Sequence, residues 1–496
     1  MSQEKEAGNA AGSTGTVEEL LQRRMAGRAR RRRTSIGSVP RADPPLLSYE
    51  QRRLWFLDGL VPGSVAYTVP STTRFRGPLD LSAFRSATDA VVARHETLRS
   101  RFDEAAGEPF HRVDEDGGTE FTVEDLSGHP DPERRAREVL ADEHEVPFDL
   151  RTGPLLRTRV LRLGPEDHVV STVFHHIVFD RDSLAIWNAE LGEAYTAYQA
   201  GRAPNLPPLP AQFPDFAAWQ RQTLTEERIE DSLRHWVSRL AGTPAVLELP
   251  ADHPRPEMPS HHAGVLDFVV PGDVSDRVRA LAERRGTTVF TVALAAFHVL
   301  LGRYTGLSQV LTGYPSNGRT EVELEGLVGF FANSLPAHGD LSGNPTFEVL
   351  LDRTHDTLLH GHQHRAVPFD RLVDRLVPVR DLSRNPLVQV WFDVATGGGS
   401  RTASLPGVEA STFDVGSAHT RFDVEIHVED HRPAPLGGRV FYARDLFDPD
   451  TMRRFAHHYT VLLASLVTEP GRRISRAELL DPAERDRLLA WGSAPV

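Results

Sequence analysis

The segment STVFHHIVFDRDS, residues 171–183, places two adjacent histidines, a carboxylate and a serine at the end of an apolar run. An imidazole changes protonation state near neutral pH, so a positioned histidine can take a proton from an attacking amine or hydroxyl. The run EDHVVSTVFHHIVFD predicts a strand that enters a loop. Neighbouring residues of a strand point to opposite faces, so only one of the two imidazoles can face a given substrate. We assign that role to His176 and a structural role to His175.

Asp180 follows the histidine pair with three residues between them. Its carboxylate could orient the imidazole, or it could form a buried ion pair that fixes its own loop. The short spacing favours the ion pair, with a basic partner from the other half of the chain. By itself the HHxxxD pattern is a weak motif, and it indicates catalysis and a purely structural pair about equally.

The elements that position this segment alternate between helices and strands. Apolar residues recur at helical spacing in LDLSAFRSATDAVVARHETLRSRF, and SLAIWNAELGEAYTAYQAG predicts an amphipathic helix that ends at Gly201. The proline-rich GRAPNLPPLPAQFP predicts an extended bridge. A second series of helices and strands follows. We therefore expect an α/β (α+β) protein of two similar-sized lobes, with the chemistry in a cleft between them.

The composition excludes several classes of protein. The chain has 496 residues, enough for two domains, and no cysteine, which excludes disulfides, thiolate nucleophiles and cysteine-ligated zinc. A formal net charge of -13 argues against nucleic acid as a partner. The N-terminus is polar, and the longest apolar stretch, residues 288–304, is shorter than a membrane span needs. We expect a cytoplasmic protein with no membrane partner, in which residues 288–304 form a buried core helix.

Residues 1–43 differ from the rest of the chain. VEELLQRRM could form a short helix, and the following RARRRRTSIGSVPRADPP is basic and ends in prolines. We interpret the segment as a flexible basic linker. The alternative is a docking segment that meets an acidic tail on another protein.

Seven motifs occur in order along the chain and strengthen the interpretation of the HHxxxD segment. They are LSYEQRRLWFLDGL (47–60), RHETLRSRF (94–102), HHIVFDRDS (175–183), FPDFAAWQR (213–221), TGYPSNGRTEVELEGLVGFFANSL (312–335), HQHRAVPFDRLVDRL (362–376) and RDLSRNPLVQVWF (380–392). Together they closely resemble the ordered core motifs of the condensation domains of nonribosomal peptide synthetases. The resemblance extends from about residue 46 to residue 492.

The resemblance implies a fold and a reaction. Two lobes similar to chloramphenicol acetyltransferase, at residues 44–215 and 216–492, would form a V-shaped pseudodimer around a central tunnel. The chain itself would bind no cofactor, because 4′-phosphopantetheine arrives on the donor and acceptor carrier proteins. The acceptor amine would attack the donor acyl or peptidyl thioester to form an amide. The domain would be monomeric, and its N-terminal segment could contact neighbouring synthetase modules.

The resemblance also assigns roles to individual residues. His176 matches the histidine that positions or deprotonates the nucleophile, beside His175. Asp180 matches a structural aspartate, and its implied partner is Arg319 of the second lobe. Ser183 keeps the serine common in the family, and we expect it to lie at the substrate or pantetheine path.

Arg181 departs from the family, which usually has glycine after the aspartate. A glycine leaves room for a pantetheine arm or acyl chain to pass close to the backbone. We expect the Arg181 side chain to point to solvent or to pair with Asp182. The alternative is a substrate-binding role, in which Arg181 gates the donor side or binds a donor carboxylate or phosphate.

No metal site is expected elsewhere in the chain. His360 and His364 share a helical face, but no HExxH glutamate lies between them. His261 and His262 follow a proline-rich loop and lack an aspartate at the right spacing, so we assign them to a loop.

Two alternatives to amide formation stay open. One is a free-standing enzyme that forms an ester with a hydroxyl acceptor; the other is a catalytically silent condensation-like domain that recruits a tailoring enzyme. Retention of both histidines and the aspartate argues against the silent domain. Epimerization is disfavoured because Leu184 stands where a tryptophan usually follows the serine. Heterocyclization is disfavoured because that subfamily replaces HHxxxD with paired aspartates.

Overall fold

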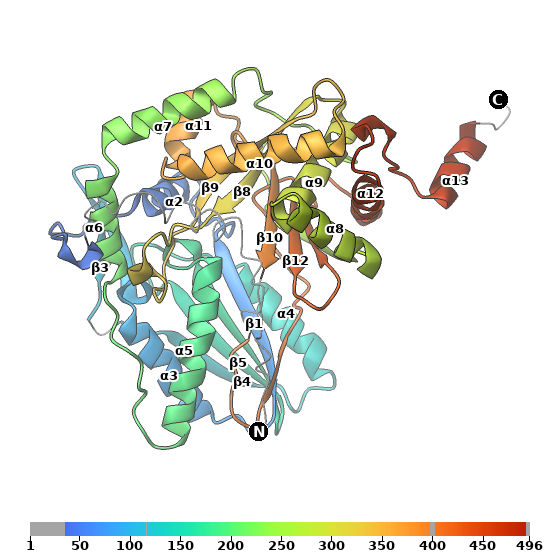
Figure 1. The fold of residues 1–496 in the computed structure, drawn as a ribbon. Coiled ribbons are helices and arrows are strands. Elements are labelled where there is room, and N and C mark those ends of the chain that lie inside the picture. The colour runs from blue at the N-terminus through green and yellow to red at the C-terminus, as the bar shows by residue number, and fades with distance from the viewer. Residues whose placement is uncertain (1–34, 116, 397–401, 493–496) are drawn as a thin grey trace, which may run out of the picture.

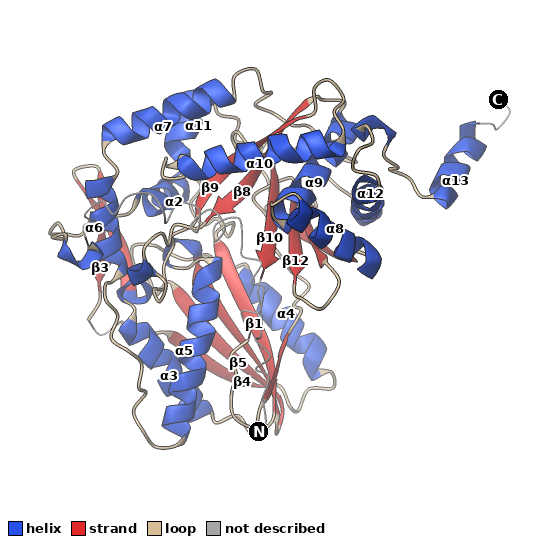
Figure 2. Cartoon of the chain, in the orientation of Figure 1, coloured by secondary structure: helices blue, strands red, loops and turns tan. Residues whose placement is uncertain are grey.

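Two sheets with helices packed on them divide the molecule into two lobes. The computed structural model describes residues 35–115, 117–396 and 402–492 (Figure 1). Both sheets are mixed, and helices and strands alternate along much of the chain (Figure 2). The predicted α/β class is therefore confirmed.

The N-terminal lobe is built on a five-stranded sheet in the order β11-β1-β6-β5-β4. Its strands are β1 (Thr68–Arg76), β4 (Glu120–Asp125), β5 (Leu156–Gly164), β6 (Asp167–His175) and β11 (Glu409–Thr412). Its helices are α2 (Tyr49–Leu60), α3 (Leu81–Arg94), α4 (Pro132–His144) and α5 (Arg181–Gln199), and a hairpin joins β2 (Ser100–Ala105) to β3 (Glu108–Val113). Figure 1 shows α3 and α5 on one side of the sheet and α4 on the other. The central strand β6 ends at the histidine pair.

The C-terminal lobe is built on a six-stranded sheet in the order β7-β13-β12-β10-β8-β9. Its strands are β7 (Ala263–Val269), β8 (Gln309–Ser316), β9 (Asn333–Asp340), β10 (Val390–Thr396), β12 (Val424–Asp430) and β13 (Gly437–Ala443). Its helices are α7 (Glu226–Arg239), α8 (Gly272–Arg284), α9 (Val289–Thr305), α10 (Phe347–Gln363), α11 (Phe369–Leu376), α12 (Pro449–Thr468) and α13 (Pro482–Gly492). Helix α9 packs on β8 and β10, α10 on β9, and α12 on β7.

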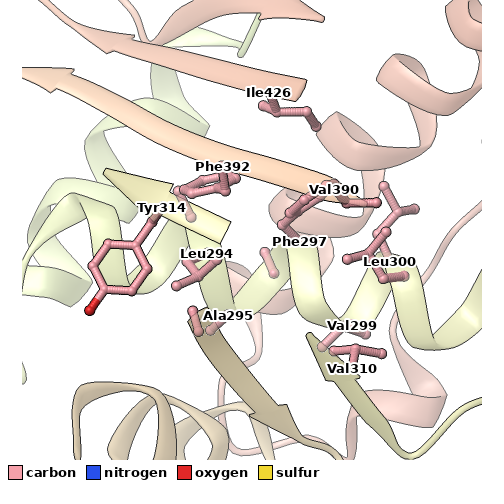
Figure 3. Packing of buried hydrophobic residues seen from close by; sticks show 14 of the residues in the cluster. Leu294, Ala295, Phe297, Val299, Leu300, Val310, Tyr314, Val390, Phe392 and Ile426 are labelled. Atoms are coloured by element: carbon pink, nitrogen blue, oxygen red, sulfur yellow. The ribbon is translucent and has the colours of Figure 1, made fainter. Parts of the chain in front are cut away.

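Helix α9 forms the centre of the larger core. Every residue from 291 to 301 is buried, as expected for a helix that is apolar on all sides. Figure 3 shows Leu294 and Phe297 packed beneath Phe392 of β10, with Val299 close to Val310 of β8. The prediction of a buried core helix is confirmed. Among the described residues no single helix has the length and apolar character that a membrane crossing requires. The bent pair α8 and α9 together meets the requirement, by length and composition only.

The lobes exchange segments, so no single cut separates them. Strand β11, from the C-terminal half of the chain, pairs antiparallel with β1 and joins the N-terminal sheet. Helix α6 (Phe213–Thr223) runs without a break across the boundary expected at residues 215 and 216. The proline-rich segment ends where α6 begins, and the boundary between the lobes stays a prediction.

The last residues of the expected linker belong to the folded body. Residues 1–34 lie outside the described residues, so their role as linker or docking segment stays a prediction. Ile36 is buried against Phe213 and Phe216. Arg41 donates to Asp215 at 2.6 Å and to Glu96 at 2.7 Å. Residues 35–43 therefore pack on α6 and do not act as a tether.

Burial of neutral histidines predicts a loss of stability in acid. His111 lies between Phe102 and Phe213, neither ring nitrogen has a hydrogen-bond partner, and burial lowers its pKa to about 3. Because the unfolded state binds a proton near pH 6.5 and the folded state does not, stability falls as pH drops from 6.5 towards 4. His111→Phe should reduce that loss in the free energy of unfolding by roughly 2–3 kcal/mol, measured by urea unfolding at pH 6.5 and pH 4.

The half-exposed His457 provides the matched control, since His457→Phe removes an imidazole that is already solvated. An unchanged pH dependence in His111→Phe would show that this ring is protonated or hydrated in the folded protein.

Candidate active site

The histidine pair lies in a one-turn 3-10 helix, η3 (His176–Val178), between β6 and α5. Its backbone is held from two sides. The His176 N–H donates to the Tyr67 carbonyl at 2.8 Å, and the Gln51 side chain of α2 donates to the Ile177 carbonyl at 3.0 Å. These two hydrogen bonds hold the turn that carries His176 independently of any contact of its side chain.

The tautomer of His176 follows from one hydrogen bond. Its Nδ1 lies 2.6 Å from the carbonyl oxygen of Phe179. A carbonyl oxygen can only accept, so Nδ1 carries the proton and donates. The other ring nitrogen, Nε2, then has a free lone pair. This arrangement is the one required of a group that accepts a proton or a hydrogen bond from a nucleophile.

The surroundings of His176 keep its ring neutral. The ring is partly buried and meets the edge of Phe330, with ring centroids 4.8 Å apart. Burial, and then the nearby positive charge of Arg421, lower its pKa to about 4. Near neutral pH the imidazole is therefore uncharged. It can orient an amine by accepting a hydrogen bond, and it holds a proton only transiently.

His175 has a structural environment. Its ring is buried, Nδ1 accepts from the Ile177 N–H at 3.1 Å, and Phe148 and Tyr67 pack around it. Burial lowers its pKa to about 3. The two neighbouring imidazoles thus have different roles, one capping the turn and the other with a free nitrogen.

Asp180 and Arg319 form a buried, two-pronged ion pair between the lobes. Arg319 Nη1 lies 2.8 Å from Asp180 Oδ2, and Nη2 lies 3.0 Å from Oδ1. Both side chains are almost fully buried. Burial alone would raise the pKa of Asp180, but Arg319 and Ser183 hold it below its ordinary value. The contact expected from the sequence is present.

The pair is completed by further donors and acceptors. Asp180 caps the first turn of α5, where it accepts from the Ser183 N–H at 2.9 Å and the Ser183 hydroxyl at 2.7 Å. The Phe331 N–H donates to Asp180 Oδ2 at 3.0 Å. Arg319 also donates to the Leu327 carbonyl. Ser183, which the sequence placed at a substrate path, is instead buried beneath the ion pair.

The segment that brings Arg319 to Asp180 follows β8. The guanidinium of Arg319 stacks on the ring of Phe331, with its central carbon 4.2 Å from the ring centroid. A Cβ at Gly318 would come within 2.1 Å of the Phe331 carbonyl oxygen, so only glycine fits beside the arginine. The segment 327–331 is therefore clamped between Arg319 and the start of α5.

Arg181 does not pair with Asp182, contrary to one expectation. Its guanidinium contacts Asp393 of β10, across the lobes, while its side chain stays half exposed. Parallel pairing places Asp393 beside His427, which also contacts Glu425. Burial opposes the charge on His427, but Asp393 and Glu425 raise its pKa to about 9. The two carboxylates of Asp393 and Glu425 thus balance the charges of Arg181 and His427. This network determines the direction of the Arg181 side chain.

A narrow pocket adjoins the histidine turn. Phe330, which contacts His176, lines it together with Glu50, Arg53, Asp370 and other residues. Burial raises the pKa of Glu50 to about 7 and also raises the pKa of Asp370. The pocket has room for no more than about one water molecule, and Arg53 lies beside the two carboxyl groups.

Sequence reasoning did not identify Phe330, Arg421, Asp393 and Glu50 as site residues. Three of them lie in quoted motif segments or next to one, but nothing in the sequence indicated their contacts in the folded chain. The usable signal was the charged residue inside each apolar strand, as in VWFDVAT and VEIHVED.

Comparison with known proteins places this geometry in a family. The model described as "Condensation domain" matches residues 43–489. One protein of the linear gramicidin synthase of Brevibacillus parabrevis is 37% identical over 460 residues, which are 92% of this chain and 6% of that protein. The chain thus spans a small part of the synthetases that it matches.

Two solved structures give the fold. The X-domain solved in complex with OxyB from teicoplanin biosynthesis has a TM-score of 0.81 at 29% identity, covering 91% of this chain and all of that one. The first condensation domain of the calcium-dependent antibiotic synthetase has a TM-score of 0.74 at 22% identity, covering 88% and 99%. These neighbours have the chloramphenicol acetyltransferase-like fold, so the predicted fold is confirmed.

Removal of one member of the Asp180–Arg319 pair should be severe. Asp180→Asn leaves the buried Arg319 with the half-exposed Asp182 as its nearest remaining countercharge, which we expect to cost about 3–5 kcal/mol in the free energy of unfolding. Asp182→Asn is the matched control, because Asp182 is half exposed and 3.8 Å from Arg319, and it should cost less than about 1 kcal/mol. Urea unfolding compares them, and equal losses in the two variants would contradict the role of the pair.

Proposed function

The chain belongs to the condensation domain family, and we propose that it joins an acyl or peptidyl thioester on a donor carrier protein to the amine of an acceptor aminoacyl thioester. Members of this family have acyltransferase-type activity, and the relatives are nonribosomal peptide synthetases. The observation that carries the proposal is His176: its Nδ1 proton is held by Phe179, its Nε2 is free, and its ring is neutral. A site without this free nitrogen would not support the reaction.

The proposed step is an addition followed by an elimination. The acceptor nitrogen lone pair attacks the donor carbonyl carbon, and Nε2 of His176 accepts the N–H proton as the C–N bond forms. Collapse of the tetrahedral intermediate breaks the C–S bond, and the proton passes to the departing pantetheine thiolate. A free α-amine has a pKa near 8, so much of it is already unprotonated near neutral pH. Positioning by His176 therefore contributes more than ground-state deprotonation.

An amine acceptor is proposed because the relatives are nonribosomal peptide synthetases. The phosphopantetheine arms belong to the donor and acceptor carrier proteins, and they would approach His176 from opposite faces.

A recruitment function is the second candidate. A structural neighbour at 29% identity, the X-domain, was solved in complex with OxyB. A domain of this kind would bind a partner protein without forming a bond. The free Nε2 of His176 is unnecessary for such a role, which is why condensation is preferred.

The direct test loads purified donor and acceptor carrier proteins with candidate thioesters and follows the products by mass spectrometry. Transfer of the donor acyl group to the acceptor amine supports the proposal. Transfer to a hydroxyl acceptor alone would replace amide by ester formation, and absence of any product across loaded pairs would favour recruitment.

Loss of the imidazole should lower turnover without unfolding the chain. His176→Ala is expected to reduce kcat by roughly 10²–10⁴-fold. Because the pKa of His176 is near 4, the fall in kcat of the wild-type enzyme on the acid side of its pH–rate profile should follow protonation of the acceptor amine. It should not follow a group with a pKa near 6.5. His457→Ala, at a half-exposed site, is the control. An acid limb at pH 6.5 that is independent of the acceptor amine would contradict the neutral ring.

Arg181 should influence which donors are accepted. Arg181→Gly removes the contact with Asp393 and opens the backbone beside α5, so bulky donors should gain in kcat/KM relative to small ones. Asp393→Asn frees Arg181 without removing it, so this variant separates loss of the contact from loss of the side chain. Unchanged donor preference in both variants would restrict Arg181 to a structural role.

A further inference from the structure

Three ligand-type side chains meet on the surface where the two lobes touch. Glu145 caps the end of α4 in the N-terminal lobe, His262 precedes β7, and His419 precedes β12. One ligand atom from each lies within 4.8 Å of the others, and this is the group among the described residues that meets this geometry. His419 and Glu145 are 274 positions apart in the chain, so the cluster exists only in the folded protein.

The backbone places the two imidazoles on one face. His262 and His419 form an isolated antiparallel bridge. The Ala263 N–H donates to the Ala418 carbonyl at 2.8 Å, and the Thr420 N–H donates to the His261 carbonyl at 2.9 Å. These flanking bonds make His262 and His419 the non-hydrogen-bonded pair, the type in which facing side chains lie closest.

The carboxylate of Glu145 lies between the two rings. His419 Nε2 is 2.9 Å from Glu145 Oε1, and His262 Nε2 is 3.5 Å from Oε2. Ligands held 2.0–2.2 Å from a tetrahedral zinc ion are about 3.3–3.6 Å apart, so small side-chain rotations bring these atoms to ligand spacing. His419 is nearly buried at 5% exposed, whereas His262 is 53% exposed.

We propose that Glu145, His262 and His419 bind a divalent transition-metal ion of the zinc class. Two imidazoles and one carboxylate are a ligand set that zinc and its neighbours prefer, and this cysteine-free chain offers no thiolate to compete. The exposed side of the cluster leaves a coordination position to water. The bound ion joins α4 of one lobe to the strands of the other, and the inference does not depend on the proposed function.

The sequence assigned His262 to a loop without a ligand role, because its partners are remote in sequence. Surface histidines elsewhere form ordinary pairs with one carboxylate, as His253 does with Asp448 and His457 does with Asp481. A third ligand and a fixed imidazole pair distinguish the proposed site from these ion pairs.

Titration of Zn²⁺ into the untagged, chelator-treated chain at pH 7.5 tests the proposal. Isothermal calorimetry should show one saturable equivalent, weakened at least tenfold in Glu145→Gln, His262→Ala and His419→Ala. Titration with Co²⁺ should give a visible absorption band that these variants lose. His253→Ala and His364→Ala are controls, the latter because His364 stacks on His235 at a ring separation of 3.9 Å in a second histidine-rich region.

A stability readout separates binding from misfolding. Saturating Zn²⁺ should raise the Tm of the wild-type chain and not that of Glu145→Gln, because a ligand stabilises only the state that binds it. Glu145 and His262 are exposed enough that their variants should keep the wild-type Tm in chelator. Absence of saturable Zn²⁺ binding, or binding that persists in these variants and is lost in His364→Ala, would overturn the proposal.

Discussion

The buried ion pair between Asp180 and Arg319 is the constraint on which the rest of the site depends. A charge in the protein interior is costly unless its partner and its remaining hydrogen-bonding groups are all satisfied. Here Asp180 accepts from Arg319, from Ser183 and from the Phe331 N–H, so its carboxylate is fully occupied. The same residue begins α5 in one lobe and contacts an arginine from the other. This contact therefore links the start of α5 to the second lobe.

That contact also determines what His176 can do. The Phe179 carbonyl that accepts from His176 Nδ1 belongs to the residue directly before Asp180, so the ring orientation is tied to the ion pair. Asp180 takes no part in orienting the ring by direct contact, unlike the acid of a catalytic triad. Around the turn, charges are balanced in separate groups: Asp180 with Arg319, and Arg181 and His427 with Asp393 and Glu425. Burial and the positive charge of Arg421 keep the His176 imidazole neutral, so it is suited to accept a hydrogen bond.

Much of the fold and part of the site could be predicted from the sequence. Periodicity indicated α9 and α5, and the HHxxxD spacing indicated that Asp180 needed a distant basic partner. Contacts that depend on strand register could not be predicted, because the pairing of β10 with β12 brings Asp393 to His427 from far along the chain. The same limit explains the mistaken partner of Arg181 and the overlooked role of His262. Residues 35–43 were misassigned because composition alone does not show that Ile36 has a pocket to enter.

A double-mutant cycle tests the central claim most directly. The free energies of unfolding of Asp180→Asn, Arg319→Gln and the double variant, measured in urea beside the wild-type chain, isolate the coupling between the two side chains. If the pair joins the lobes, each single variant leaves a buried polar group without its partner. The double variant then recovers part of the loss, with a coupling energy of at least about 2 kcal/mol. Losses that add to within about 0.5 kcal/mol would contradict the account.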